Sequence, residues 1–512
     1  MMNEKWEEQF REQIHEFVGT IEKFDKGEID RKAYKGISGG FGSYAQRDPS
    51  KHMLRLRMAG GNLTEKRLEF LAEAVRDYGV ELMKLTTCET VQLHNLKAEQ
   101  VPVLMEKAIA SEIYSRGGGG DNPRNIMMSP LSGVQKGEAF DVKPYAEAAA
   151  EYLLSIAGEI HMPRKLKVAF CNGADDSVHS AFRDMGFMAN PDGTFTLRIA
   201  GGLGGGYKMG VLVDEHVPAT EILYYIRAMI ETFCQHGNYE NRAKARTRFM
   251  QETMGVDGLK AAFLENVAKV KEKGGLDLHV EAKPVTKKGS GEISGKRVVA
   301  QKQPGLYAVA YHPIGGCLPA GKPAELLTLV REIPDAECRI APHETIYIIN
   351  LTADEVEKVL EATNDGAQST FENSVACIGA AICQQGVRDS QAALRAAVEA
   401  VREAKIPDGA LPRICISGCP SSCSGHQAAA LGFQGAAKTV DGKPESAFKM
   451  FVGGSDKLGA AKFGEAGAVI LERDLPKFFV ELGKAVASRN MNWETWIAGH
   501  EDEFKAIVEK YA

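Results

Sequence analysis

The stretch MLRLRMAGG, residues 53–61, decides the fold because a related stretch, LYAVAYHPIGG, follows at residues 306–316. Each is an apolar run that ends in a Gly-Gly pair, and the pairs Gly60-Gly61 and Gly315-Gly316 are 255 residues apart. A register kept this long indicates an internal duplication. The same spacing relates further identical residues: Leu63 and Leu318, Leu71 and Leu326, Arg76 and Arg331, Glu89 and Glu344, Thr90 and Thr345, Leu96 and Leu351, Ala98 and Ala353, Val101 and Val356, Glu106 and Glu361.

Each copy predicts an α+β unit with β-α-β-β-α order. The Gly-Gly turn is followed by apolar residues at helical spacing, such as Leu68, Leu71 and Val75, and then by a β-rich stretch and a short helix. A longer region follows each copy and also repeats, because residues 186–204 resemble residues 432–459. We therefore expect two related halves, each an α+β unit followed by a larger region.

Composition excludes several classes of protein. The 512 residues carry a formal charge of −6, which gives no broad basic field for nucleic acid. No run reaches the roughly 18 apolar residues of a membrane span, and the charged N-terminus is unlike a signal peptide, so we expect a cytoplasmic protein without membrane partners. The glycine runs at 116–122 and 201–206 do not match dinucleotide or P-loop spacing, so direct binding of a nicotinamide dinucleotide is not indicated.

Two pairs of cysteines carry the main chemical signal. Cys377 and Cys383 are separated by five residues, and Cys419 and Cys423 by three, in segments rich in Gly and Ser. Four thiolates with backbone N–H groups nearby suit an iron–sulfur cluster. Structural zinc favours tighter spacing, and packed free thiols are a third interpretation; the spacing alone leaves all three open.

These residues resemble a known family. The C-x5-C and C-x3-C pairs are similar to the signatures of the sulfite and nitrite reductases, which carry sirohaem coupled to a [4Fe-4S] cluster. The resemblance extends from about residue 40 to 470 through these motifs: GSYAQRD, MLRLRMAGG, KLTTCETVQLH, GDNPRNIMMSPLSG, MPRKLKVAF and NRAKARTRFM.

The resemblance implies two ferredoxin-like repeats, each followed by an α/β half that binds the cofactors. The expected divisions are an N-terminal arm at 1–50, a first repeat at 51–115, a first sirohaem-binding half at 116–270, a Lys/Gly-rich linker or loop at 271–303, a second repeat at 304–366, and a second half at 367–512 that binds sirohaem and the cluster.

The resemblance also implies roles for individual residues. Cys377, Cys383, Cys419 and Cys423 would ligate the cluster, and Cys423 would also be the axial ligand of the sirohaem iron. Cys415 is expected in a strand that leads into the loop. The expected substrate-facing cations are Arg57, Arg124, Lys165 and Lys167. Further cofactor-binding residues are expected at Thr87, Gln92, His94 and Asn125.

The expected reaction is the six-electron reduction of a small anion. Lys167 and His94 resemble the sulfite type and favour sulfite to sulfide, whereas GDNPRN and SPLSG resemble the nitrite type, so nitrite to ammonia is the alternative. Because the chain shows no flavin or nicotinamide motif, the electron donor is external. Ferredoxin is the donor that the resemblance implies, and a separate donor subunit is equally compatible.

Two positions depart from the family pattern. Cys88 stands where the family commonly has an Arg that pairs with sirohaem carboxylates, and Ser421 stands where it commonly has Asn. A hydroxyl can still donate a hydrogen bond, so the change at Ser421 is compatible with the site. Cys88 supports a remote alternative, a cluster protein that transfers or senses electrons without reducing an anion.

Overall fold

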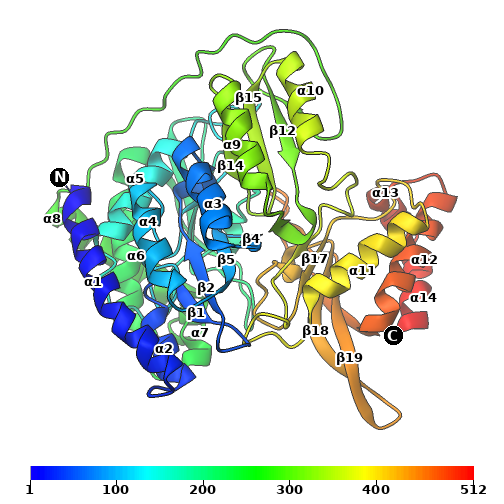
Figure 1. Cartoon of the computed structure of the whole chain (residues 1–512), viewed down its shortest axis with the longest axis horizontal. Helices are drawn as coiled ribbons and strands as arrows, with labels where there is room; N and C mark the ends of the chain where they lie inside the picture. The colour runs from blue at the N-terminus through cyan, green and yellow to red at the C-terminus, as the bar shows by residue number, and fades with distance from the viewer. Residues whose placement is uncertain (1) are drawn as a thin grey trace.

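The computed structural model describes the backbone of residues 2–512 and the side chains from Trp6 onward. The N-terminal region is two helices, α1 (Met2–Asp25) and α2 (Arg31–Ser38). They pack through stacked aromatic rings: Phe24 lies on Tyr34, and Phe17 lies on Phe41, both with ring centroids 4.2 Å apart. Helix α1 lies against helix α4 of the first repeat, at the edge of the molecule (Figure 1).

Two ferredoxin-like repeats have the same order of elements. Leu68, Leu71 and Ala74 form the buried face of the first long helix, which ends at Gly79 in the left-handed conformation that favours glycine. The first repeat comprises β1 (Ser43–Ala45), β2 (His52–Leu56), β3 (Asn62–Leu63), α3 (Glu65–Tyr78), β4 (Leu82–Leu85), β5 (Val91–Leu96) and α4 (Gln100–Ala110). The second comprises β11 (Val298–Ala300), β12 (Tyr307–Tyr311), β13 (Cys317–Leu318), α9 (Lys322–Glu332), β14 (Glu337–Ile340), β15 (Ile346–Leu351) and α10 (Ala353–Ala362).

The repeats complete each other's sheets. The first sheet has the order β1-β2-β5-β4-β13 and the second β11-β12-β15-β14-β3, so each takes its last strand from the other repeat. Cys317 of the second repeat pairs with Lys84 of the first. The equivalent residues Asn62 and Arg339 pair in the same way, with the roles of the two repeats reversed. One hydrophobic core therefore contains residues of both repeats, from Ala45 to Val359, together with residues of the N-terminal helices.

The Gly-Gly pairs make this exchange possible. Gly60, Gly61, Gly315 and Gly316 all have φ between 56° and 68°, in the left-handed region. A Cβ on Gly61 would lie 2.5 Å from the Ile340 carbonyl oxygen, which belongs to the other repeat. Glycine is thus required both by the backbone conformation and by the neighbouring strand.

Each repeat is followed by an α/β half built on a five-stranded sheet. In both sheets the first three strands in chain order are parallel and the next two are antiparallel. The first half comprises β6 (Met127–Met128), α5 (Lys143–Ser155), β7 (Val168–Cys171), β8 (Met185–Ala189), β9 (Thr194–Ile199), β10 (Val211–Pro218), α6 (Ile222–His236), α7 (Met250–Thr253) and α8 (Gly255–Lys273). The second comprises β16 (Val375–Ala376), α11 (Ser390–Glu403), β17 (Ile414–Ser417), β18 (Leu431–Val440), β19 (Lys443–Val452), β20 (Glu465–Leu471), α12 (Leu475–Ser488), α13 (Trp493–Gly499) and α14 (Glu501–Tyr511).

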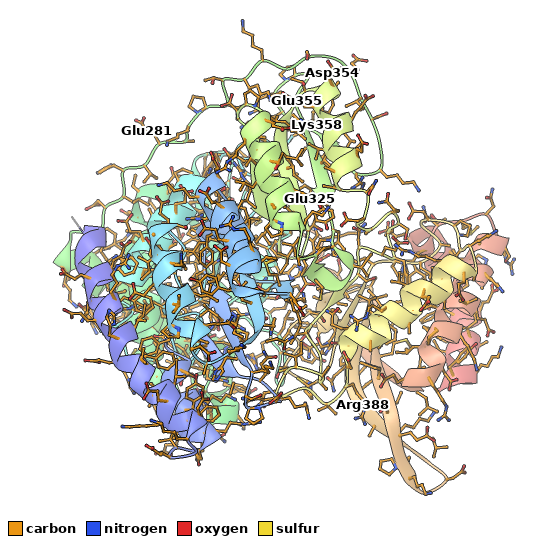
Figure 2. The ribbon with its side chains drawn as sticks, in the orientation of Figure 1. Glu281, Glu325, Asp354, Glu355, Lys358 and Arg388 are labelled. Carbon is orange, nitrogen blue, oxygen red and sulfur yellow. The ribbon has the colours of Figure 1, made fainter. Side chains whose placement is uncertain are left out.

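An extended segment joins the halves. After Lys273 the chain has no helix or strand until Val298, and it crosses the outside of the molecule (Figure 1). Glu281 in this segment lies at the outer edge, whereas Arg388 lies near the base of the projecting β18–β19 hairpin (Figure 2). Among residues 2–512, no helix has both the length and the apolar character needed to cross a membrane. The architecture confirms the expected α+β class with an internal duplication.

Candidate active site

The four cysteines lie on two adjacent segments of the second half. Cys377 follows strand β16, Cys419 and Cys423 follow the neighbouring parallel strand β17, and Cys383 lies on the loop before α11. The Gly418 carbonyl accepts hydrogen bonds from the N–H groups of Val387 and Arg388 at 2.8 and 2.9 Å, which ties the two segments together. The sequence therefore brings both pairs to one end of the sheet.

These four residues are here called the thiol cluster, because Cys377, Cys383 and Cys419 are all electrostatic neighbours of Cys423. Desolvation by the surrounding protein and the neighbouring Cys377, Cys383 and Cys419 raise the pKa of Cys423 to about 12, although Lys165 opposes the rise. Neutral thiols packed together become thiolates when a metal centre supplies positive charge.

Hydrogen bonds to sulfur also fit a cluster. The Gly418 N–H donates to Cys377 Sγ at 3.2 Å, and the Ser390 hydroxyl lies 3.1 Å from the same sulfur. A backbone donor such as the Gly418 N–H stabilises a thiolate, whereas the Ser390 hydroxyl donates to the Cys377 carbonyl at 2.8 Å. Cys415 is different: it lies within β17, and burial raises its pKa to about 12, with Arg413, Asp456 and Glu344 as its charged neighbours.

The first half contains a counterpart of this loop without the thiols. Val168 pairs with Met185 as Ile414 pairs with Leu431, so the loops 171–185 and 417–431 correspond residue by residue. The Asn172 N–H donates to Ser129 Oγ at 3.0 Å, the counterpart of the bond from Gly418 to Cys377. Ser129, Gly173 and Ser177 thus stand where Cys377, Cys419 and Cys423 stand in the second half.

Cations gather beside Cys423. Burial lowers the pKa of Lys165 well below its ordinary value, and Arg246, Lys167 and Arg124 lower it further. Burial also lowers the pKa of Lys167, and Arg183 and Arg246 add to this. We call the group Arg55, Arg124, Lys165, Lys167, Arg183 and Arg246 the cationic cluster. Its charge suits the carboxylates of a sirohaem and a small anion.

The two predicted arginines have different surroundings. Arg124 donates to the carbonyls of Gly119 and Gly120 at 2.5 and 2.8 Å, so it shapes the glycine-rich loop beside the site. Arg57 is 2 % exposed and donates to the backbone carbonyls of Arg116 and Arg124 at 2.7 and 3.0 Å. The structure thus brings Arg124, Lys165 and Lys167 together with Cys423 and places Arg57 behind Arg124.

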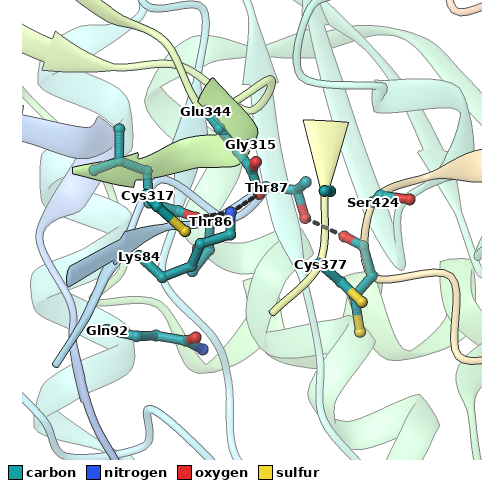
Figure 3. Close-up of polar contacts among 12 residues, drawn as sticks. Lys84, Thr86, Thr87, Gln92, Gly315, Cys317, Glu344, Cys377 and Ser424 are labelled. Atoms are coloured by element: carbon teal, nitrogen blue, oxygen red, sulfur yellow. Dashed lines mark hydrogen bonds and ion pairs between the residues drawn. The ribbon is translucent and has the colours of Figure 1, made fainter. Parts of the chain in front are cut away.

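The first repeat contributes the turn after β4 and the strand β5. Thr87 Oγ1 donates to the Cys423 carbonyl at 2.9 Å (Figure 3). Asn125 Nδ2 donates to the carbonyls of Cys88 and Glu89 at 3.0 and 3.1 Å, which fixes the turn. Gln92 lies 3.2 Å from His94, whose pKa is lowered to about 3 by burial and by the cations Arg55 and Lys84.

Sequence reasoning did not assign Arg55, Arg183 or Arg246. Arg55 lies opposite Gln92 in the sheet and donates to the Gly118 carbonyl at 2.6 Å. Arg246 donates to the buried Asp184 carboxylate at 2.9 Å, which also accepts the Lys167 N–H at 2.9 Å. Arg55 lies in the motif MLRLRMAGG and Arg246 in NRAKARTRFM, so membership of these motifs could have pointed to both. Arg183 lies in no such motif.

Comparisons with known proteins agree with this architecture. The family described as nitrite/sulfite reductase ferredoxin-like half domain matches residues 44–111, and the nitrite and sulphite reductase 4Fe-4S domain matches residues 119–271. The second match covers the first α/β half, whose loop lacks the four thiols. The two halves are related by duplication, so the first half can match the model of a 4Fe-4S domain without holding the thiols itself. The solved structure of the Mycobacterium tuberculosis NirA protein shares the fold, with a TM-score of 0.78 at 23 % identity over 94 % of this chain and 92 % of that one.

Curated relatives come from distant organisms. Ferredoxin--nitrite reductase of Synechococcus elongatus is 27 % identical over 85 % of this chain and 86 % of its own length. The chloroplastic enzyme of Arabidopsis thaliana is 27 % identical over 79 % of this chain and 71 % of its own length. The assimilatory ferredoxin-dependent nitrite reductase of Haloferax mediterranei is 26 % identical over 81 % and 76 %. The chain belongs to the nitrite and sulfite reductase family, whose members are oxidoreductases that carry a sirohaem and a [4Fe-4S] cluster.

Proposed function

We propose that this chain reduces nitrite to ammonia with six electrons, and that sulfite is its second substrate. The observation that carries the choice of nitrite is the run of relatives named as nitrite reductases, from a plant, a cyanobacterium and an archaeon, each aligned over most of its length. The sequence criterion for sulfite depends on Lys167 and His94. His94 is only 3 % exposed and lies behind Gln92, which weakens its use as a marker of the substrate.

The thiol cluster would hold the iron–sulfur centre, with Cys423 shared with the sirohaem iron. Once bound, a sirohaem and an iron–sulfur cluster would supply the single-electron transfers that the reduction requires. The protein's own contribution begins with position: Thr87 holds the Cys423 backbone, and Asn125 holds the turn that carries Thr87. The loop that carries the shared ligand is thereby fixed against the first repeat.

The cationic cluster would bind the anion and supply protons. Arginine side chains such as Arg124 and Arg183 stay charged and neutralise carboxylates and substrate. Lys165 can give up a proton more readily than an ordinary lysine because its pKa is lowered. Lys165 and Lys167 are therefore our candidates for proton delivery to the nitrogen or sulfur oxyanion as its oxygens leave as water.

We further propose ferredoxin as the external donor, as in the names of the relatives. The test of the whole proposal is anaerobic purification of the holoenzyme, a visible spectrum, and turnover of nitrite and of sulfite with reduced viologen and with ferredoxin. We expect tetrapyrrole bands and a higher kcat/KM for nitrite. A sirohaem-containing protein that prefers sulfite would reverse the order of substrates, and a protein without tetrapyrrole would refute the proposal.

A further inference from the structure

Cys88 lies on a turn whose geometry is fixed. The turn joins β4 to β5, and its Glu89 has φ of 54°. The Cys88 N–H donates to Thr86 Oγ1 at 3.3 Å, and the Cys88 carbonyl accepts from Asn125 Nδ2 at 3.0 Å. The direction of the Cys88 side chain is therefore set by backbone contacts on both sides.

The side chains of Cys88 and Lys167 are neighbours, and each shifts the pKa of the other. Lys167 is equally well anchored, because its N–H donates to Asp184 at 2.9 Å and its carbonyl accepts from the Met185 N–H at 3.0 Å. The two residues come from different domains of the fold, a ferredoxin-like repeat and an α/β half. Their contact depends on how these domains pack.

The duplicated half supports this contact independently. His343 is the counterpart of Cys88, because it follows it by 255 residues. Arg413 is the counterpart of Lys167, because each directly precedes the equivalent strand, β17 or β7. His343 and Arg413 also lie within electrostatic range of each other, and burial followed by Arg413 lowers the pKa of His343. The fold thus brings these two positions together in both copies, as a Cys–Lys pair in one and a His–Arg pair in the other.

The surroundings of the pair are mostly positive. Arg183 and Arg55 face Cys88, and Arg183 and Arg246 face Lys167. Arg124 is a further cation near Cys88. The acidic neighbours are Glu89, whose pKa burial raises well above its ordinary value, and Asp184, which is bound by Arg246. An ammonium group among guanidinium groups is destabilised unless an anion offsets them.

We propose that Cys88 is a positioning residue of the reaction site: its sulfur, as a thiolate, accepts a hydrogen bond from the Lys167 ammonium group and holds that group charged beside the substrate. Burial alone would raise the pKa of Cys88, but Lys167, Arg183 and Arg55 outweigh it and lower this pKa to about 6. The thiolate therefore predominates at neutral pH and serves as the counter-charge of Lys167. The pairing of Cys88 with Lys167 does not depend on the proposed function. Only the effect of this pairing on turnover rests on it.

The first experiment reads the ionisation of Cys88 without turnover. Infrared spectra of the holoenzyme would be recorded from pH 5 to 9, and the S–H stretching band of Cys88 would be identified as the band absent from Cys88→Ser. We expect this band to disappear near pH 6 in the wild type. In Lys167→Met the midpoint should rise by about one pH unit or more, the scale of a close opposite charge. The control Lys269→Met, on the exposed face of α8, should leave it in place.

The second experiment reads the effect on Lys167. Cys88→Ala should shift the alkaline limb of the kcat/KM profile for nitrite to lower pH, so that activity near pH 8 falls by about tenfold, because Lys167 loses the anion that keeps it protonated. Cys88→Asp should restore the limb. Visible spectra would establish that each variant carries both cofactors.

Two results would overturn the proposal: an S–H band that Lys167→Met does not move, or a Cys88→Ala profile that coincides with the wild type in a fully loaded enzyme. Failure of the proposed function would look different. A loaded protein that reduces neither anion would refute that function, while the infrared midpoints would still decide whether Cys88 and Lys167 are paired.

Discussion

Lys84 of the first repeat and Glu344 of the second form an ion pair in which each side chain is only 3 % exposed (Figure 3). Lys84 lies on β4, where it pairs with Cys317 of the exchanged strand β13, and Glu344 lies on the turn between β14 and β15. Removing one partner of a buried pair leaves the other charge without compensation. We expect Lys84→Met to reduce the free energy of unfolding by about 3–5 kcal/mol, measured by urea unfolding of the anaerobic holoenzyme.

A surface pair provides the control. Lys457 and Glu494 are 67 % and 73 % exposed, so Lys457→Met should cost less than about 1 kcal/mol. Equal losses for the two variants would contradict a special role for the pair between the repeats.

Gly61 and Gly79 offer a matched comparison of glycine substitutions. Their φ angles are 64° and 63°, but a Cβ on Gly79 would meet nothing within 4 Å, whereas one on Gly61 would meet Ile340. Gly79→Ala should cost about 1 kcal/mol for the backbone conformation alone. Gly61→Ala should cost at least about 2 kcal/mol more, because the strand of the other repeat must move. Differential denaturant unfolding would measure both, and similar costs would argue against close contact at Gly61.

Cys415 and Cys423 should respond differently to replacement by serine. Cys415 belongs to a strand and has no other cysteine among its charged neighbours, so Cys415→Ser should keep the spectra of both cofactors and the iron content. Cys423→Ser should lose the sirohaem bands and the cluster absorbance. Visible spectroscopy with iron and sulfide determination decides this, and the reverse pattern would overturn the assignment of the ligands.

Replacing Lys165 should affect catalytic activity alone, whereas replacing Arg57 should also reduce the stability of the fold. Lys165→Met should lower kcat/KM for nitrite by about 100-fold or more, the scale of one lost charge at a reacting centre, with little change in the unfolding midpoint. Arg57→Met should lower the unfolding midpoint as well, since the Arg116 and Arg124 carbonyls lose their donor. Steady-state kinetics and denaturant unfolding on both variants, with Lys269→Met as control, test the difference.

Asp456 links the halves and should give a pH-dependent contribution to stability. It lies 3.0 Å from both His179 Nε2 and an Arg413 nitrogen, and these partners outweigh burial and hold its pKa below the ordinary value of 3.8. A carboxylate with a lowered folded pKa stabilises the fold above its unfolded pKa, and this stabilisation is lost as the pH falls towards the folded pKa. Asp456→Asn should therefore cost about 1–3 kcal/mol at pH 7, a gap that stays constant down to pH 5 and closes only below pH 4. Urea unfolding of wild type and variant across this range checks it, and a gap that narrows between pH 7 and 5 would point to another group.

The duplication and the thiol pairs could be predicted from the sequence because both are local patterns at fixed spacing. The exchange of β3 and β13 could not, since each is a two-residue strand that has no detectable alternation of its own. The hydrogen-bond partners of Arg57 could not be predicted either. Arg55 and Arg57 are two residues apart on one strand path, and only the course of the loop 116–124 decides which backbone carbonyls each guanidinium binds.

The exchanged strands also constrain the order of events on the ribosome. Strand β4 ends at Leu85, but the strand that covers its open edge, Cys317–Leu318, is synthesised more than 200 residues later. At about 5–20 residues per second, this edge stays uncovered for roughly 10 to 50 s. An exposed edge is a site for wrong pairing between chains. The nascent first half is therefore exposed to wrong pairing at this edge throughout that interval.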